Sequence, residues 1–137
     1  MTQKIYIIAA EPSADLHGAA LLHELRRIAP EVQTLGWGGD KMAAEGHRIE
    51  VHFREASFMG FSEVIKNLPK ILSLIRKTKK SILNSRPDLI LLMDYPGFNL
   101  RMAKWCKKQG FKVYYYISPQ VWAWKEKRVE TLRQYVD

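Results

Sequence analysis

The chain has 137 residues, of which 47% are hydrophobic and 26% are charged, values within the ordinary range of soluble globular proteins. This length fits one domain with a core of its own, and no apolar stretch is long enough to cross a bilayer. The formal net charge of +8 predicts attraction to a polyanionic partner: nucleic acid, an anionic membrane surface or a phosphorylated substrate. Charge alone does not choose among these three.

The N-terminal segment does not have the pattern of an export signal. Its apolar run after Lys4 stops at Glu11, which is too short for the core of a signal peptide with its cleavage site. We therefore expect the chain to remain in the cytoplasm. The single cysteine, Cys106, falls in a helical pattern, and one cysteine can form neither a disulfide framework nor a cysteine-based metal site. We expect it to be inert.

Hydrophobic periodicity predicts alternating strands and helices in the first half of the chain. The predicted elements are a strand over residues 4–10, a helix over 13–28, a strand over 32–35 that runs into a loop at 36–39, a short helix from a cap at Asp40 to about Gly46, and a strand over 49–53. The glycines of the loop at 36–39 permit close backbone approach to a ligand, although a plain turn explains them equally simply.

The second half begins with the longest predicted helix, over residues 61–86, which Pro87 ends. Pro69 lies inside it, and because proline lacks an amide donor and clashes with the preceding turn, we expect a kink or two separate helices. The apolar run at 89–93 is typical of a central parallel strand covered on both faces. The remaining predicted elements are a helix over 97–108 capped by Gly110, a strand over 111–117 and a helix over 121–136.

This order predicts a doubly wound α/β fold, a Rossmann-like parallel sheet with helices on both faces, in which residues 1–137 form a single domain. Ligands of such sheets bind outside the carboxyl ends of the strands. The loops after the predicted strands are therefore the candidate site. Four of them contain unusual residues: 10–15, 36–40, 94–99 and 118–124.

Asp94 directly follows the apolar run at 89–93. A carboxylate in that position points into the crevice at the strand ends and could act as a general base on a hydroxyl nucleophile. It could equally cap the helix that begins around Pro96, because proline is favoured at the first helical position. The pattern of residues supports both interpretations.

The loop at 10–15 joins a strand to a helix N-terminus, where backbone amides can bind an anion. It lacks the glycines of a phosphate-binding loop, and Glu11 and Asp15 would repel a phosphate, so two carboxylates there suit sugar hydroxyls better. The structural alternative is that Ser13 caps the helix and Asp15 complements its dipole, which leaves Glu11 less well explained.

Trp122 and Trp124 lie two residues apart at the start of a basic helix, so they would not share one helix face. Either one packs in the core while the other is exposed, or they offer a flat surface to a sugar or an acyl chain. The residues expected to contact substrate are Glu11, Ser13, Asp15, Asn99, Ser118 and Trp122.

Between Val64 and Pro87 the chain has no acidic residue, and its basic residues flank an apolar stripe. This composition is typical of an interfacial helix on anionic lipid, and large apolar residues precede it. The alternatives are a solvated face on a core helix and, with less support from the loops, a nucleic-acid patch. The residues expected at a membrane surface or near acyl chains are Phe58, Met59, Phe61, Lys66, Lys70, Lys77 and Lys80.

Five blocks of sequence resemble the lipid-A-disaccharide synthase family, in family order and over essentially the whole chain. They are IIAAEPSADLHG at 7–18, GWGGDKM at 36–42, FMGFSEV at 58–64, PDLILLMDYPGFN at 87–99 and YYISPQVWAW at 115–124, the last two being highly specific. The resemblance implies the N-terminal, acceptor-side domain of a GT-B glycosyltransferase, a type with two facing Rossmann-like halves. It also implies that the C-terminal nucleotide-sugar domain is absent from this chain.

The resemblance implies that the full enzyme transfers 2,3-diacylglucosamine from its UDP-sugar to the 6-hydroxyl of 2,3-diacylglucosamine 1-phosphate. The product is the β-1,6 lipid A disaccharide, formed with inversion and without a metal or other cofactor. The essential aspartate of the family matches Asp94, as base on the acceptor hydroxyl, and residues 58–61 match its membrane-associated surface. Ala10 and Ala14 stand where the family commonly has glycine, and Gly97 stands where many members have a second aspartate.

The expected partners are therefore a UDP-sugar lipid donor, a phosphorylated glycolipid acceptor and the anionic inner face of the inner membrane, and not nucleic acid. We expect this chain alone to be inactive as a transferase. The alternative function is a peripheral membrane-binding module that uses the basic helix, in which Asp94 is merely a cap. A nucleic-acid binder follows from the net charge alone.

Overall fold

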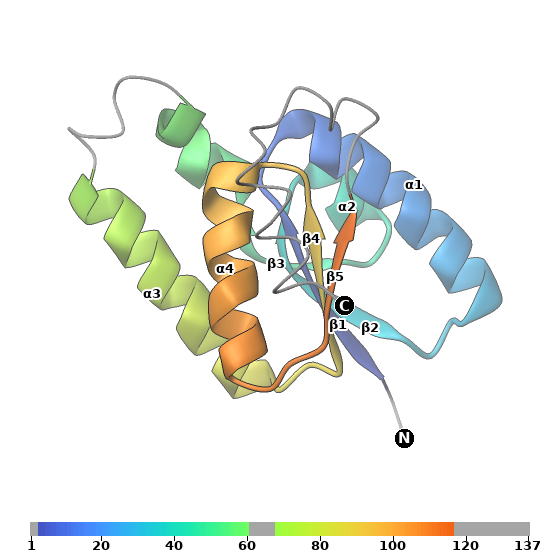
Figure 1. Ribbon diagram of the computed structural model, residues 1–137. Helices are drawn as coiled ribbons and strands as arrows, with labels where there is room; N and C mark the ends of the chain where they lie inside the picture. The colour runs from blue at the N-terminus through green and yellow to red at the C-terminus, as the bar shows by residue number, and fades with distance from the viewer. Residues whose placement is uncertain (1–2, 61–67, 117–137) are drawn as a thin grey trace.

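The computed structural model describes residues 3–60 and 68–116 (Figure 1). Its elements are β1 (Lys4–Ala9), α1 (Pro12–Ile28), β2 (Gln33–Gly38), α2 (Asp40–Ala44), β3 (Arg48–His52), the 3-10 helix η1 (Phe53–Gly60), α3 (Leu68–Ser85), β4 (Leu89–Met93), α4 (Pro96–Lys108) and β5 (Val113–Tyr116). The predicted helix over 121–136 lies outside the described residues, as does the segment 61–67 that precedes α3.

The described strands form one parallel sheet in the order β3-β2-β1-β4-β5. Strand β1 lies at the centre and pairs with β2 on one side and β4 on the other, so Ile7 lies opposite both Gly36 and Leu91. A parallel sheet needs a crossover between successive strands, and helices supply most of these crossovers here. The predicted Rossmann-like fold is confirmed, and it is consistent with the N-terminal domain of a GT-B glycosyltransferase.

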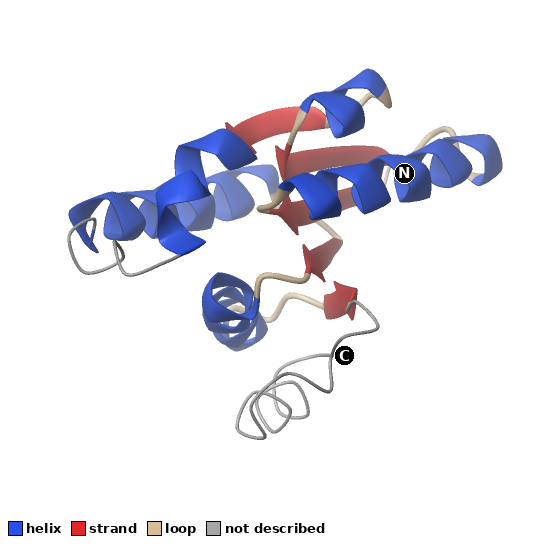
Figure 2. Cartoon of the chain, turned by 90° about the horizontal axis from the view of Figure 1, so that it is seen from above, coloured by secondary structure: helices blue, strands red, loops and turns tan. Residues whose placement is uncertain are grey.

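Helices cover both faces of the sheet (Figure 2). The side chains of β1 alternate between the two layers: Tyr6 and Ile8 join a hydrophobic cluster with residues of α3 and α4, whereas Ile7 and Ala9 join a cluster with residues of α1 and α2. This alternation follows from the two-residue period of a strand. It places α1 and α4, which follow the adjacent strands β1 and β4, on opposite faces.

The loop predicted at 36–39 is mostly strand. β2 continues through Gly38, and Trp37 is fully buried, with its indole N–H donating to Thr78 Oγ1 at 2.9 Å. Gly36 has a φ of +127°, and a Cβ atom there would lie 2.3 Å from the carbonyl oxygen of Ile7. This glycine therefore allows β1 and β2 to approach closely and does not form a turn. The cap of α2 is Gly39 and not Asp40.

The predicted C-terminal end of α4 is confirmed. Gly110 has a φ of +89°, its N–H donates to the Lys107 carbonyl, and the N–H of Phe111 donates to the Cys106 carbonyl, both at 3.0 Å. These two bonds satisfy carbonyls that the end of a helix leaves unpaired. Cys106 itself is fully buried, and burial raises the pKa of its thiol to about 12.

The described part of α3 begins at Leu68, so Pro69 lies in its first turn, and the predicted kink or break there stays a prediction. In the described ranges, 3–60 and 68–116, no helix combines the length and apolarity needed to cross a bilayer.

Candidate functional site

The carboxyl ends of β1 and β4 lie side by side at the point where the strand order reverses, with β2 and β3 added on one side of β1 and β4 and β5 on the other. Ala9 and Met93 are the last residues of these strands and lie opposite each other in register. From there the chain enters α1 on one face of the sheet and α4 on the other. The loops at 10–11 and 94–95 therefore border the crevice in which open α/β sheets bind ligands.

Asp94 lies at this crevice in an unusual backbone conformation. The φ angles of Asp94 and Tyr95 are +47° and +49°, in the left-handed region that side chains other than glycine rarely adopt. Each such residue costs roughly 1 kcal/mol or more. Tyr95 is the N-cap of α4 and Pro96 follows at the first helical position, so the interpretation of Asp94 as the cap of this helix is wrong. Strained residues of this kind cluster at active sites.

The main chain of Asp94 is hydrogen-bonded on both sides. Its N–H donates to the Tyr116 carbonyl at 3.0 Å. Its carbonyl accepts from Asn99 Nδ2 at 2.8 Å and from the Tyr115 hydroxyl. Residues from α4 and β5 thus fix the peptide that carries the candidate base.

Glu11 and Tyr95 lie close to Asp94. Glu11 is half-buried at the N-cap position of α1, where its side chain makes no capping hydrogen bond. Burial raises the pKa of Glu11, and the negative charge of Asp94 raises it further. The pKa of Tyr95 is raised by burial and by the charge of Glu11. The structure therefore brings together the predicted Asp94 and Glu11, and it adds Tyr95, which no sequence pattern had indicated.

Asp15 has a different environment. It is 4% exposed, its Oδ1 accepts from the amides of Gly39 and Met42 at 2.9 and 3.0 Å, and its Oδ2 accepts from the amide of Lys41 at 3.2 Å. It thus caps the N-terminus of α2 from the first turn of α1. Its carboxylate is engaged by the protein's own amides, so the contacts described here give no support to its predicted role in substrate binding.

Ser13 does not cap α1. The cap position belongs to Glu11, Pro12 follows it, and Ser13 is exposed in the first turn. The structural interpretation of this loop is therefore wrong for Ser13. Asp15 does lie in the first turn of α1, as that interpretation requires, but its carboxylate accepts from amides at the start of another helix. A substrate contact by Ser13 stays a prediction.

Asn99 is fully buried in α4. Its Nδ2 atom lies within 3.4 Å of the Ile8 carbonyl oxygen and within 3.2 Å of the Met93 carbonyl oxygen, besides bonding Asp94. All of these contacts are with main-chain atoms, so its predicted contact with substrate also stays a prediction. Ser118, Trp122, Phe61 and Lys66 lie outside the described residues, and the side chains of Phe58 and Met59 are not described.

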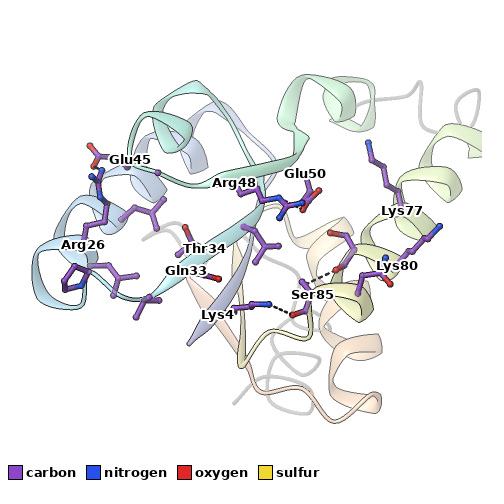
Figure 3. A pocket seen from close by; sticks show the side chains of 18 residues that line it. Lys4, Arg26, Gln33, Thr34, Glu45, Arg48, Glu50, Lys77, Lys80 and Ser85 are labelled. Carbon is purple, nitrogen blue, oxygen red and sulfur yellow. Dashed lines mark hydrogen bonds and ion pairs between the residues drawn. The ribbon is translucent and has the colours of Figure 1, made fainter. Parts of the chain in front are cut away.

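The predicted membrane-facing lysines Lys70, Lys77 and Lys80 are exposed on α3. Lys77 and Lys80 also line a cavity of about 830 Å³, which is bordered by the first residues of β1 and β2, among them Lys4 and Gln33 (Figure 3). This cavity therefore lies at the amino-terminal edge of the sheet, opposite the edge that carries Asp94. Its lining mixes basic residues with Glu45 and Glu50, so it has no clear ligand chemistry.

Metal ligation finds no support in the described residues, since no group of three or more His, Cys, Asp or Glu side chains in 3–60 and 68–116 could hold an ion. The expectation that the reaction needs no metal stays a prediction.

Comparison with known proteins identifies the family. The family model described as lipid-A-disaccharide synthetase matches residues 5–137. This chain belongs to the lipid-A-disaccharide synthase family. Its curated relatives include the lipid-A-disaccharide synthases of Trichlorobacter lovleyi, 41% identical over 98% of this chain, Anaeromyxobacter sp. strain K, 40% identical over 100%, and Coxiella burnetii, 38% identical over 98%.

The chain covers 35% or 36% of the length of these relatives, so it spans about a third of each, in their N-terminal part. The resemblance inferred from the five sequence blocks is confirmed. The two family departures in the first loop are accommodated, because the methyl groups of Ala10 and Ala14 are buried in the two hydrophobic clusters.

Proposed function

We propose that this chain forms the acceptor-side domain of a lipid-A-disaccharide synthase, with Asp94 as the general base. The observation that carries the proposal is the position of Asp94. It lies at the crevice between β1 and β4, one residue before the N-cap of α4. Its backbone is strained, and its charge acts on a second carboxylate, that of Glu11. Membership of the family supports the same role, because the essential aspartate of the family falls on this residue.

In the proposed reaction Asp94 accepts the proton of the acceptor 6-hydroxyl while that oxygen attacks the anomeric carbon of the UDP-sugar. A new glycosidic bond forms, the bond to the UDP oxygen breaks with its electron pair leaving on UDP, and the anomeric centre inverts. The donor is UDP-2,3-diacylglucosamine and the acceptor is 2,3-diacylglucosamine 1-phosphate. A C-terminal nucleotide-sugar domain supplies the donor contacts, so residues 1–137 alone are inactive. Disaccharide formation by the isolated chain would refute that last point.

The test is Asp94→Asn in the complete reading frame that contains this chain. Loss of the base should lower kcat by about 10²- to 10⁴-fold, while the melting temperature stays within a degree or so. Asp88→Asn is the matched control, because Asp88 lies just before the same strand, is exposed, and accepts a main-chain bond from Lys4 at 2.8 Å. Undiminished turnover by Asp94→Asn would remove the proposal.

We also propose that α3 rests on the anionic inner face of the inner membrane. In its support, α3 has no acidic residue from Leu68 to Ser85 and exposes three lysines, Lys70, Lys77 and Lys80. Each basic residue near an anionic surface contributes about 1 kcal/mol of attraction. This surface would keep the enzyme near its lipid substrates.

Sedimentation with phosphatidylglycerol vesicles tests this surface. Changing Lys70, Lys77 and Lys80 together to Glu should abolish binding to these vesicles. The same change of Lys104, Lys107 and Lys108, which are exposed on α4, alters the net charge equally and should reduce binding much less. Equal losses from both variants would show that binding depends on net charge and not on α3.

A further inference from the structure

The left-handed conformation of Asp94 and Tyr95 needs an opposing interaction to persist. The loop between β4 and α4 is short, and neither residue is a glycine. Left to itself, the chain at 94–95 would relax toward right-handed or extended φ angles, and such a change would turn the Asp94 side chain away from its present direction. Together with the bond from the Asp94 N–H to the Tyr116 carbonyl, the hydrogen bonds to the Asp94 carbonyl oppose this relaxation.

Two side chains supply those bonds, and they come from different elements. Asn99, in the first turns of α4, donates through Nδ2 at 2.8 Å, and Tyr115, in β5, donates through its hydroxyl. The Asn99 amide also lies 3.2 Å from the Met93 carbonyl oxygen and 3.4 Å from that of Ile8. Because all three neighbours are acceptors, the nitrogen must be the atom that faces them. One amide thus ties the end of β1, the end of β4 and the Asp94 peptide together.

Packing alone does not explain an asparagine at position 99. The residue is fully buried, and its Oδ1 atom has no hydrogen-bond partner within the described part of the chain. A buried polar atom without a partner is costly, and an apolar side chain would avoid that cost. Its neighbours Phe98, Leu100, Met102 and Ala103 are buried and apolar. The amide therefore serves the three carbonyls that it bonds.

We propose that Asn99 and Tyr115 are positioning residues, which hold the Asp94 peptide in its left-handed conformation and so direct the Asp94 carboxylate toward the acceptor hydroxyl. This inference rests on the proposed function of Asp94. Neither residue touches the reacting atoms: both act through the carbonyl of Asp94. The arrangement is effective because a general base must be held within a fraction of an ångström of the proton that it removes.

Tyr115→Phe in the complete reading frame is the decisive variant, because it removes the hydroxyl and keeps the ring. We expect kcat to fall by about 10- to 100-fold, with KM within about twofold of its original value and the urea midpoint unchanged. A purely structural role would lower the urea midpoint or the yield of folded protein and leave the kcat of the folded enzyme intact. Tyr114→Phe is the matched control, since Tyr114 precedes it in β5 and is 44% exposed, and it should leave kcat unchanged.

Asn99→Ala removes the second donor and should lower kcat at least as far, at some cost in stability because three carbonyls lose a partner. Should this variant fail to fold, Tyr115→Phe decides alone. A crystal structure of Tyr115→Phe in which Asp94 has left the left-handed region would support the inference. A kcat within twofold of the original in Tyr115→Phe would overturn it. If Asp94→Asn remains active the proposed function fails, whereas an inactive Asp94→Asn beside a fully active Tyr115→Phe refutes only the positioning role.

Discussion

Asp15 and Asp94 occupy similar places in the sequence, yet the structure uses different parts of the two residues. The Asp15 side chain is buried and accepts three backbone amides around the N-terminus of α2. For Asp94 it is the main chain that is fixed, by β5 and α4, while its carboxylate lies near Glu11 at the crevice. The role of each aspartate thus depends on contacts with distant parts of the chain, which form only in the fold.

The largest expected effect on stability comes from Asp15→Ala. Three backbone amides, two of them buried, would lose their carboxylate acceptor, and we expect the free energy of unfolding to fall by about 3 kcal/mol. Urea unfolding followed by circular dichroism measures this. The matched control is Asp40→Ala, which removes an exposed carboxylate that contacts His52 and Arg54 and should cost less than about 1 kcal/mol. Equal urea midpoints for the original protein and Asp15→Ala would contradict the cap.

Local patterns predicted the elements of both regions well. The strand at 89–93 has the predicted bounds, and the helices at 13–28 and 97–108 begin one residue earlier than predicted. These elements follow from hydrophobic period, proline and glycine signals within a few residues. The position of Asp94 at the ligand-binding edge followed from the same reasoning.

What the sequence did not predict depends on partners far along the chain. Asp15 binds amides 24 to 27 residues away, and Asn99 contacts a carbonyl 91 residues away. The glycines around Trp37 predict a loop because Gly36 and Gly38 resemble a turn, whereas in the structure Gly36 allows the close approach of β1. No local pattern contains this information, because a long-range contact is fixed only when the sheet has formed.

A smaller effect on the free energy of unfolding is expected from His47, which is buried, as Asp15 is. The ring is 4% exposed, with Nδ1 3.0 Å from Thr34 Oγ1 and Nε2 3.3 Å from the Trp37 carbonyl oxygen. Burial lowers its pKa from 6.5 to about 4. The unfolded chain therefore binds a proton more readily than the folded chain between these two values, and stability falls as the pH falls through this window.

Urea unfolding at pH 7 and pH 5 tests the effect of His47. This residue should account for a loss of about 2 kcal/mol between the two values. The loss should disappear in His47→Gln and persist in His23→Gln, whose ring is exposed on α1. A loss of the same size in His47→Gln would assign the pH dependence to other groups.

Gly39 and Gly97 differ in the space that a side chain would find there. A Cβ atom at Gly39, beside Asp15, would lie 2.3 Å from the Phe53 ring and 2.7 Å from Asp15 Oδ2, whereas a Cβ at Gly97, near Asp94, would meet no atom within 4 Å. Gly97→Asp should raise the free energy of unfolding by up to about 1 kcal/mol, since it stiffens the helix and adds a negative charge to its first turn. Gly39→Ala should lower it. A destabilised Gly97→Asp protein would show that the surroundings of this position are more crowded than described.

The smallest expected effect tests whether the two carboxylates at the crevice face each other. Burial and the charge of Asp94 both raise the pKa of Glu11, in that order of size. Asp94→Asn removes the second cause and keeps the first, so the pKa of Glu11 should fall and still remain above its ordinary value. An NMR titration of 13C-labelled glutamate side chains measures this, with Asp15→Asn as the control that should leave Glu11 unchanged. If Asp94→Asn does not lower the pKa of Glu11, the Asp94 carboxylate points elsewhere, and the base must reach the acceptor from another direction.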